Sequence, residues 1–210
     1  MRRSTLGFTL VEVLVALMVM AIMAAMAWQG IDGIARARST SEGQVDRMLR
    51  LTSVVAQWEQ DLAAIHDTPV VQPLCFDGST LRLTRRSERG VVVVAWTLRE
   101  QGLQRWASPP SATAGELLRH WQRSLQAPAD DAGALRMVSG ASRWQLYYYR
   151  DSAWTNAQSS GDLSRGAGGG QGCPREALPA GVRLVLTFAP GSGFDGALLR
   201  DVLLASARPS

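Results

Sequence analysis

The chain begins with a long apolar stretch and continues with two regular patterns. From Phe8 to Trp28 nearly every residue is apolar, and Glu12 carries the only charge. A stretch of this length can cross a bilayer as one helix. Further apolar residues then follow at spacings of three and four: Met48, Leu51, Val55, Trp58, Leu62 and Ile65. This spacing predicts one face of an amphipathic helix, with Asp61 among the polar residues off that face.

One helix is therefore predicted from about Phe8 to His66, and Pro69 follows its end. Beyond Val70 apolar and polar residues alternate, which is typical of strands. In 81–84 the alternation predicts a half-buried strand, with Leu81 and Leu83 on the buried side. Further strands are predicted at 91–98, 103–106, 143–150, 182–188 and 198–205, with 153–154 as a continuation across a turn at Asp151.

A second, short helix is predicted at 114–125. Its apolar face would comprise Leu117, Leu118, Trp121 and Leu125. The stretches 127–134 and 156–172 are predicted to be loops, and the second is rich in Gly and Ser. The predicted fold class is α+β: a long N-terminal helix, transmembrane in its first half, packs on a mostly antiparallel β-sheet.

The residues before the apolar stretch resemble a short leader. Arg2 and Arg3 are basic, and the natural break, Gly7-Phe8, lies before the apolar core. An ordinary secretory signal is cleaved after its apolar core, so cleavage here would leave the helix on the mature protein. The alternative is an ordinary signal anchor with an incidental Glu12.

This beginning resembles the type IV pilin and pseudopilin signature. The matching residues are Gly7, Phe8, Thr9, Leu10, Glu12, Leu14, Ala16 and Leu17. The resemblance implies cleavage between Gly7 and Phe8 by a prepilin peptidase and N-methylation of Phe8. It also implies that Glu12 pairs with the N-terminal amine of a neighbouring subunit. A charge inside a membrane helix is costly, which makes Glu12 a functional candidate.

Several later segments resemble the J subunit, a minor pseudopilin of type II secretion systems. They are WEQDL (58–62), LRLTRR (81–86), LQRW (103–106), RWQLYYY (143–149) with Trp154, and LPAGVRLVLTF (178–188). The resemblance implies a tip complex with I-type and K-type minor pseudopilins, next to the major pseudopilin, that initiates pseudopilus assembly and aids export of folded proteins. K-type subunits typically lack the membrane glutamate and bind calcium, whereas this chain has Glu12 and no calcium-loop pattern.

These expectations divide the chain into four parts: a cleaved leader (1–7), a transmembrane half-helix (8–28), a periplasmic half-helix (29–66) and a β-rich periplasmic domain (67–210). The protein would lie in the inner membrane as a single-pass protein. Two alternative functions remain: a minor type IV pilin that primes pilus assembly, and a membrane-anchored periplasmic enzyme.

Composition adds few candidates for chemistry. The basic residues are scattered, so the formal net charge of +4 does not indicate nucleic acid binding. Cys75 and Cys173 could form a disulfide in an oxidising compartment or be two unrelated thiols. Neither cysteine has metal-ligand spacing, and no cofactor or metal is predicted. The chain has two histidines, His66 and His120, but it contains no GxSxG motif that would mark a nucleophile. No catalytic residue is therefore predicted.

The tryptophans divide into two predicted groups. Trp58, Trp96 and Trp144 fall in core patterns, and Trp28 falls at the membrane edge, where aromatic rings are favoured. Trp106, Trp121 and Trp154 could instead be exposed and meet partner subunits.

Overall fold

The computed structural model describes residues 9–99, 102–126, 133–158 and 175–204. The chain divides into two compact units, 1–48 and 49–210. The first helix, α1 (Leu10–Ala63), runs through the end of the first unit into the second. Its bounds agree within three residues with the predicted helix, and it continues through the glycines at 30, 33 and 43.

The second unit contains two antiparallel β-sheets. The first sheet has the order β1-β2-β3-β4-β5, with β1 (Leu74–Phe76), β2 (Thr80–Ser87), β3 (Gly90–Arg99), β4 (Gly102–Ala107) and β5 (Ala134–Val138). The second sheet has the order β7-β6-β8-β9, with β6 (Ala141–Arg150), β7 (Ala153–Asn156), β8 (Gly181–Phe188) and β9 (Ala197–Leu203).

The main core forms around the last turns of α1. Leu51, Val54, Trp58 and Leu62 are buried there against side chains of both sheets, among them Leu83 of β2 and Leu184 of β8. Trp58 packs edge to face on Trp96 of β3 and on Trp144 of β6, with ring centroids 5.4 and 6.3 Å apart. One helix face thus holds the two sheets together.

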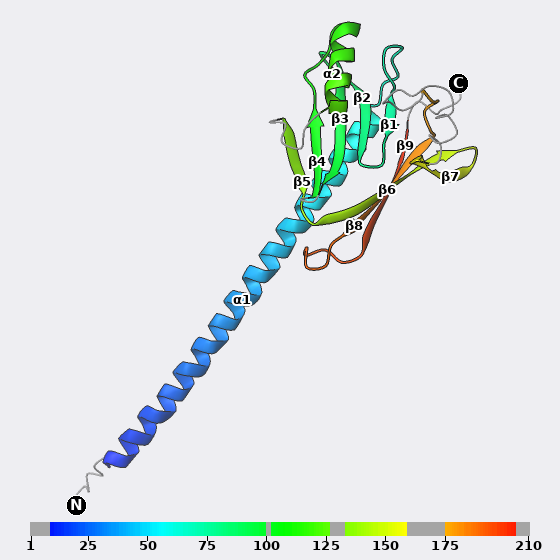
Figure 1. Ribbon diagram of the computed structural model, residues 1–210. Coiled ribbons are helices and arrows are strands. Elements are labelled where there is room, and N and C mark those ends of the chain that lie inside the picture. The colour runs from blue at the N-terminus through cyan, green and yellow to red at the C-terminus, as the bar shows by residue number, and fades with distance from the viewer. Residues whose placement is uncertain (1–8, 100–101, 127–132, 159–174, 205–210) are drawn as a thin grey trace, which may run out of the picture. The chain divides into compact units, whose positions relative to one another are not determined.

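A second core lies on the other side of the first sheet. There the helix α2 (Ala114–Gln126) covers β3, as Figure 1 shows. Leu117 and Trp121 of this helix pack with Val93, Ala95 and Cys75. The first sheet is therefore covered on both faces, which explains why five consecutive residues of β2, Thr80–Thr84, are buried.

The predicted α+β class and antiparallel pairing are confirmed, with two sheets in place of the single predicted one. The turn between β6 and β7 lies at Asp151 as predicted, with φ of 47° there and 66° at Ser152. Such paired positive φ values fit a tight hairpin turn. Two strands, β1 and β5, were not predicted, and Ala134, the first residue of β5, was assigned to a loop.

Burial differs from the prediction at Asp61, at Arg82 and Thr84, and on the buried face of α2. Asp61 was expected off the apolar face but is completely buried. Arg82 and Thr84 were expected on an open strand face, but α2 covers that side of the sheet. The buried face of α2 comprises Leu117, Trp121 and Ser124, while Leu118 and Leu125 are exposed. The polar group of Ser124 can be buried because its hydroxyl donates to the carbonyl of Trp121, at 2.6 Å.

Candidate functional site

The first candidate site is the beginning of α1, where Thr9 and Glu12 cap the helix. The Thr9 N–H and hydroxyl donate to Oε2 of Glu12, at 3.2 and 3.0 Å. In return, the Glu12 N–H donates to the Thr9 hydroxyl oxygen at 3.3 Å. This reciprocal pattern is a capping box, and it satisfies backbone donors that the first helical turn leaves free.

Glu12 therefore has a role within its own chain besides its predicted role between subunits. Both of its hydrogen bonds from Thr9 use Oε2, so neither involves Oε1. This cap was not predicted, although its signal, Thr-x-x-Glu before an apolar run, is present in the sequence. Gly7 and Phe8, the predicted cleavage and methylation residues, lie outside the described residues.

The following turns of α1 expose apolar side chains. From Leu10 to Met26 the large apolar residues are open to the surroundings, and Trp28 is exposed as well. Within the described part of the chain, α1 is the one helix long and apolar enough to cross a membrane. At about 1.5 Å per residue, the segment from Leu10 to Trp28 nearly matches a hydrocarbon core of about 30 Å.

The second candidate site is the buried carboxylate of Asp61, near the end of α1. Arg85 of β2 contacts its Oδ1 at 2.5 Å, and Arg105 of β4 makes two bonds to the carboxylate, at 2.7 and 2.9 Å. Trp96 Nε1 donates at 2.9 Å and Gln57 Nε2 at 3.1 Å. We call these five residues the Asp61 cluster.

The Asp61 cluster connects α1 to β2 and β4 and does not have the properties of a reactive centre. Every oxygen of the carboxylate accepts hydrogen bonds, and the groups around it are guanidinium, indole and amide donors that do not exchange protons readily. The signal in the sequence was weak: Asp61 follows Trp58 by three residues and so falls on the buried side of the helix.

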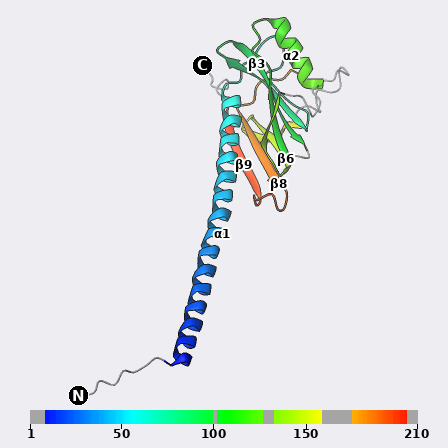
Figure 2. The ribbon, with the colours of Figure 1, turned by 90° about the vertical axis from the view of Figure 1, so that its left-hand side faces the viewer.

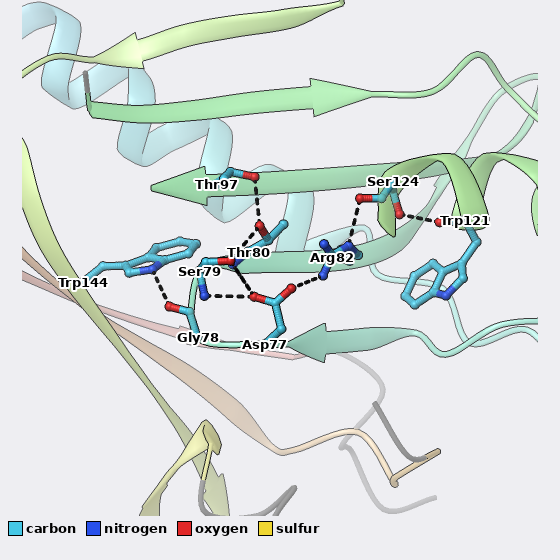
Figure 3. A network of polar contacts seen from close by, with 9 residues as sticks. All are labelled: Asp77, Gly78, Ser79, Thr80, Arg82, Thr97, Trp121, Ser124 and Trp144. Atoms are coloured by element: carbon cyan, nitrogen blue, oxygen red, sulfur yellow. Dashed lines mark hydrogen bonds and ion pairs between the residues drawn. The ribbon is translucent and has the colours of Figure 1, made fainter. Parts of the chain in front are cut away.

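A third polar group joins α2 to the β1–β2 turn, as Figure 3 shows. Arg82 pairs with Asp77 at 2.5 Å, and its Nε donates to the carbonyl oxygen of Ser124 at 3.1 Å. Asp77 also accepts from the N–H groups of Ser79 and Thr80, at 2.9 and 2.8 Å. Burial raises the pKa of Asp77, but the Arg82 guanidinium and these N–H groups together hold it below its usual value.

The remaining predicted residues have structural surroundings or are not described. His66 follows α1, and its N–H donates to the Thr84 carbonyl at 2.9 Å. His120 Nδ1 lies 3.0 Å from the hydroxyl of Ser111. Among the described residues, no three His, Cys, Asp or Glu side chains gather in a way that could hold a metal ion.

Cys75 is buried beneath α2 and is disulfide-bonded. Its predicted partner, Cys173, lies outside the described residues, so the pairing stays a prediction. Most of the predicted 156–172 loop lies outside them as well.

The predicted division of the tryptophans into core and exposed residues is only partly confirmed. Trp58, Trp96 and Trp144 are buried in the main core. Trp106 and Trp121, expected as exposed candidates, are buried in the second core. Trp154 is half-buried, and the guanidinium of Arg183 lies 4.2 Å from its ring centroid.

Comparison with known families identifies the N-terminal segment. Residues 2–28 match the family described as the prokaryotic N-terminal methylation motif. No curated protein matches the chain closely enough to count as a relative. The exposed apolar helix is consistent with a membrane anchor and a periplasmic domain. The chain is therefore a type IV pilin- or pseudopilin-like protein, identified by its methylation motif and by the long apolar helix that precedes its antiparallel sheets.

Proposed function

We propose that this protein is a J-type minor pseudopilin of a type II secretion system. In this proposal it is a non-enzymatic, single-pass protein of the inner membrane, and its second unit is periplasmic. It joins I-type and K-type minor pseudopilins at the tip of the pseudopilus, initiates assembly on the major pseudopilin, and aids export of folded proteins.

The Asp61 cluster carries this proposal beyond the general family. Three of the segments that resemble J subunits meet in it: WEQDL supplies Asp61, LRLTRR supplies Arg85 and LQRW supplies Arg105. Two further segments, RWQLYYY and LPAGVRLVLTF, form the neighbouring strands β6 and β8. The resembling segments are thus packed on one another, as expected if together they specify one fold.

At the N-terminus we propose cleavage between Gly7 and Phe8 and methylation of the new Phe8 amine. The amine of a neighbouring subunit would then approach Oε1 of Glu12, while Oε2 keeps its bonds to Thr9. An ammonium paired with a carboxylate is stabilised strongly in a low-dielectric medium, provided that other hydrogen bonds satisfy both groups. The two hydrogen bonds that Thr9 donates to Glu12 supply part of these additional hydrogen bonds.

Substituting Glu12 by Gln and by Ala separates the two roles of this residue. Gln can serve in a capping box but carries no charge, whereas Ala can do neither. If the amine pairing operates, both Glu12→Gln and Glu12→Ala should reduce incorporation into pseudopili, measured as the fraction of the protein in sheared filaments. Reduced incorporation of Glu12→Ala alone would assign Glu12 to the helix cap and contradict the pairing.

The tip role itself is tested by co-purification. The full chain would be co-expressed with tagged I-type and K-type subunits from the same source, extracted in detergent and analysed by size exclusion. A stable ternary complex is the expected result. Failure of the folded chain to join these partners, together with co-elution with minor pilins of a pilus machine, would replace the proposal by a pilus-priming role.

A further inference from the structure

The second sheet ends in a strand, β9, whose outer edge pairs with no other strand of the described residues. β9 lies beside β8, and no described strand pairs with its other side (Figure 2). The Leu204 N–H donates to the Ala180 carbonyl at 3.0 Å, and Gly196 accepts from the Phe188 N–H at 3.4 Å. Because bonded and non-bonded pairs alternate in antiparallel sheets, the even-numbered residues of β9 turn their backbone groups toward β8.

The odd-numbered residues therefore turn their N–H and C=O groups outward. These residues are Ala197, Leu199, Asp201 and Leu203, and all of them are exposed. Their side chains share the face of the sheet that points away from the core. On that face Leu199 is 56% and Leu203 77% exposed, on either side of Asp201.

This edge lacks the devices that protect other sheet edges in the described part of the protein. β1 has three residues and β7 four, and the pairing of β5 with β4 is interrupted between Leu103 and Gln104. β9 has seven residues in unbroken register with β8 and contains no Pro or Lys. Short strands, irregularities and free charges are the usual obstacles to pairing with another chain.

The charges on β9 do not block the edge, because both are already paired. Arg183 of β8 makes two hydrogen bonds to Asp201, each 2.7 Å long. Arg200 points to the other face of the sheet and pairs with Glu59 of α1. Each oxygen of the Asp201 carboxylate accepts only one of these bonds and has a second lone pair. A strand added to β9 would therefore meet backbone groups, apolar side chains and one carboxylate that can accept a further basic donor.

A second copy of this chain fits the edge poorly. The antiparallel register that pairs all of β9 with itself sets Arg200 opposite Arg200 of the second copy. Shorter registers set Asp201 opposite itself, leave Leu203 without a strand residue opposite, or pair three residues of β9 or fewer. Like charges directly opposite each other destabilise strand pairing, so the occupant should be a different chain.

We propose that the outer edge of β9 binds an extended segment of a different protein, which adds to the second sheet as a further strand. The segment carries a basic side chain opposite Asp201 and apolar side chains opposite Leu199 and Leu203. Its pattern is therefore apolar-x-basic-x-apolar. Main-chain bonds would supply affinity and the alternating side chains specificity. This interaction surface does not depend on the proposed secretion role.

The probe is a fluorescein-labelled peptide, Thr-Thr-Val-Thr-Lys-Thr-Val-Thr-Thr, titrated with the full chain in detergent micelles and followed by fluorescence anisotropy. Saturable binding above that to empty micelles is expected, and its absence would overturn the proposal. Replacing Lys by Glu in the peptide should weaken binding by about threefold or more. Equal binding of both peptides would contradict the assignment of Asp201.

Backbone pairing is tested by N-methylation of the peptide. Methylating one alternating set of nitrogens should weaken binding by about tenfold or more, and methylating the other set should have little effect. Equal effects of both sets would exclude strand addition.

A matched pair of variants tests β9 itself. Leu199→Pro removes an outward N–H but no hydrogen bond to β8, so the strand should remain folded. This variant should lose peptide binding, whereas Leu199→Thr, which keeps the N–H, should weaken it by only a few-fold. Unchanged binding by a folded Leu199→Pro variant would overturn the proposal. A dimer in sedimentation that Leu199→Pro dissolves would assign the edge to a second copy instead.

Discussion

Asp61 places a carboxylate inside the second unit between two guanidinium groups, so its removal should be costly. Asp61→Asn keeps the shape of the side chain but leaves Arg85 and Arg105 without an anion. Breaking a buried ion pair typically lowers the free energy of unfolding by about 3–5 kcal/mol. We expect a loss of this size in urea denaturation of the full chain in detergent.

Glu59 provides the control, since it lies on the same helix, two residues from Asp61. Its ion pair with Arg200 is partly exposed, with 33% and 49% of the two side chains accessible. Glu59→Gln should change the free energy of unfolding by about 1 kcal/mol or less. Similar losses of unfolding free energy in both variants would contradict the larger contribution expected from the buried ion pairs of Asp61.

The lowered pKa of Asp77 predicts a loss of stability in acid. The folded protein holds the pKa of this carboxyl below 3.8, so the unfolded chain binds a proton more readily. The contribution of Asp77 is therefore complete well above pH 3.8 and is lost as the pH falls through the folded-state pKa.

Urea midpoints measured from pH 7 to acid for the wild type and Asp77→Asn test this. The difference between the two proteins should shrink as the pH falls. A constant difference would mean that the charge of Asp77 does not stabilise the fold. Comparing the two proteins cancels the contributions of Glu116 and Asp201, whose pKa values are also lowered.

At the level of elements, the packing of α2 should stabilise the protein through its buried face, which differs from the apolar face predicted from the sequence. Trp121 is 8% exposed and packs over β3, whereas Leu118 is 43% exposed. Trp121→Ala should lower the free energy of unfolding by about 3–5 kcal/mol through the cavity it leaves. Leu118→Ala, the matched control, should cost about 1 kcal/mol or less. Chemical denaturation of both variants would decide, and a larger loss in Leu118→Ala would contradict the described face.

Both helices begin with the same local device. Thr113 and Glu116 repeat at α2 the arrangement of Thr9 and Glu12: Oε2 of Glu116 accepts from the Ala112 and Thr113 N–H groups, at 2.9 and 3.2 Å. The N–H groups of Ala112 and Thr113 hold the pKa of Glu116 below its usual value. Because the device is short-range, it can form in α1 and α2 despite their very different surroundings.

For the whole molecule, the predicted bond between Cys75 and Cys173 would close a loop of almost half the chain. Such a loop restricts the unfolded chain, so Cys173→Ser should lower the free energy of unfolding by about 2–5 kcal/mol. Pairing is checked directly by mass spectrometry of an unreduced digest, which should contain one peptide joining both residues. Two separate peptides with blocked or free thiols would contradict the pairing.

Features that depend on neighbours along the chain could be predicted from the amino-acid sequence. The apolar run, the three-and-four spacing near Trp58 and the alternation in 182–188 predicted α1 and β8, because helices and strands repeat with fixed periods. The turn at Asp151 was also predictable from the segments on either side. The signature around Gly7 and Glu12 could also be recognised from the sequence, because its residues are contiguous along the chain.

Which polar residues are buried, and how the strands divide into two sheets, depends on contacts between residues that are distant in the sequence. Asp61 is buried because Arg85 and Arg105, distant in sequence, supply its counter-charges. Arg82 is buried because α2 returns over a strand face that alternation alone marks as open. Strands as short as β1 carry too few residues for a periodic signal, and they exist because a neighbouring strand offers bonds. Pairing and burial are long-range events, and periodicity reports only local geometry.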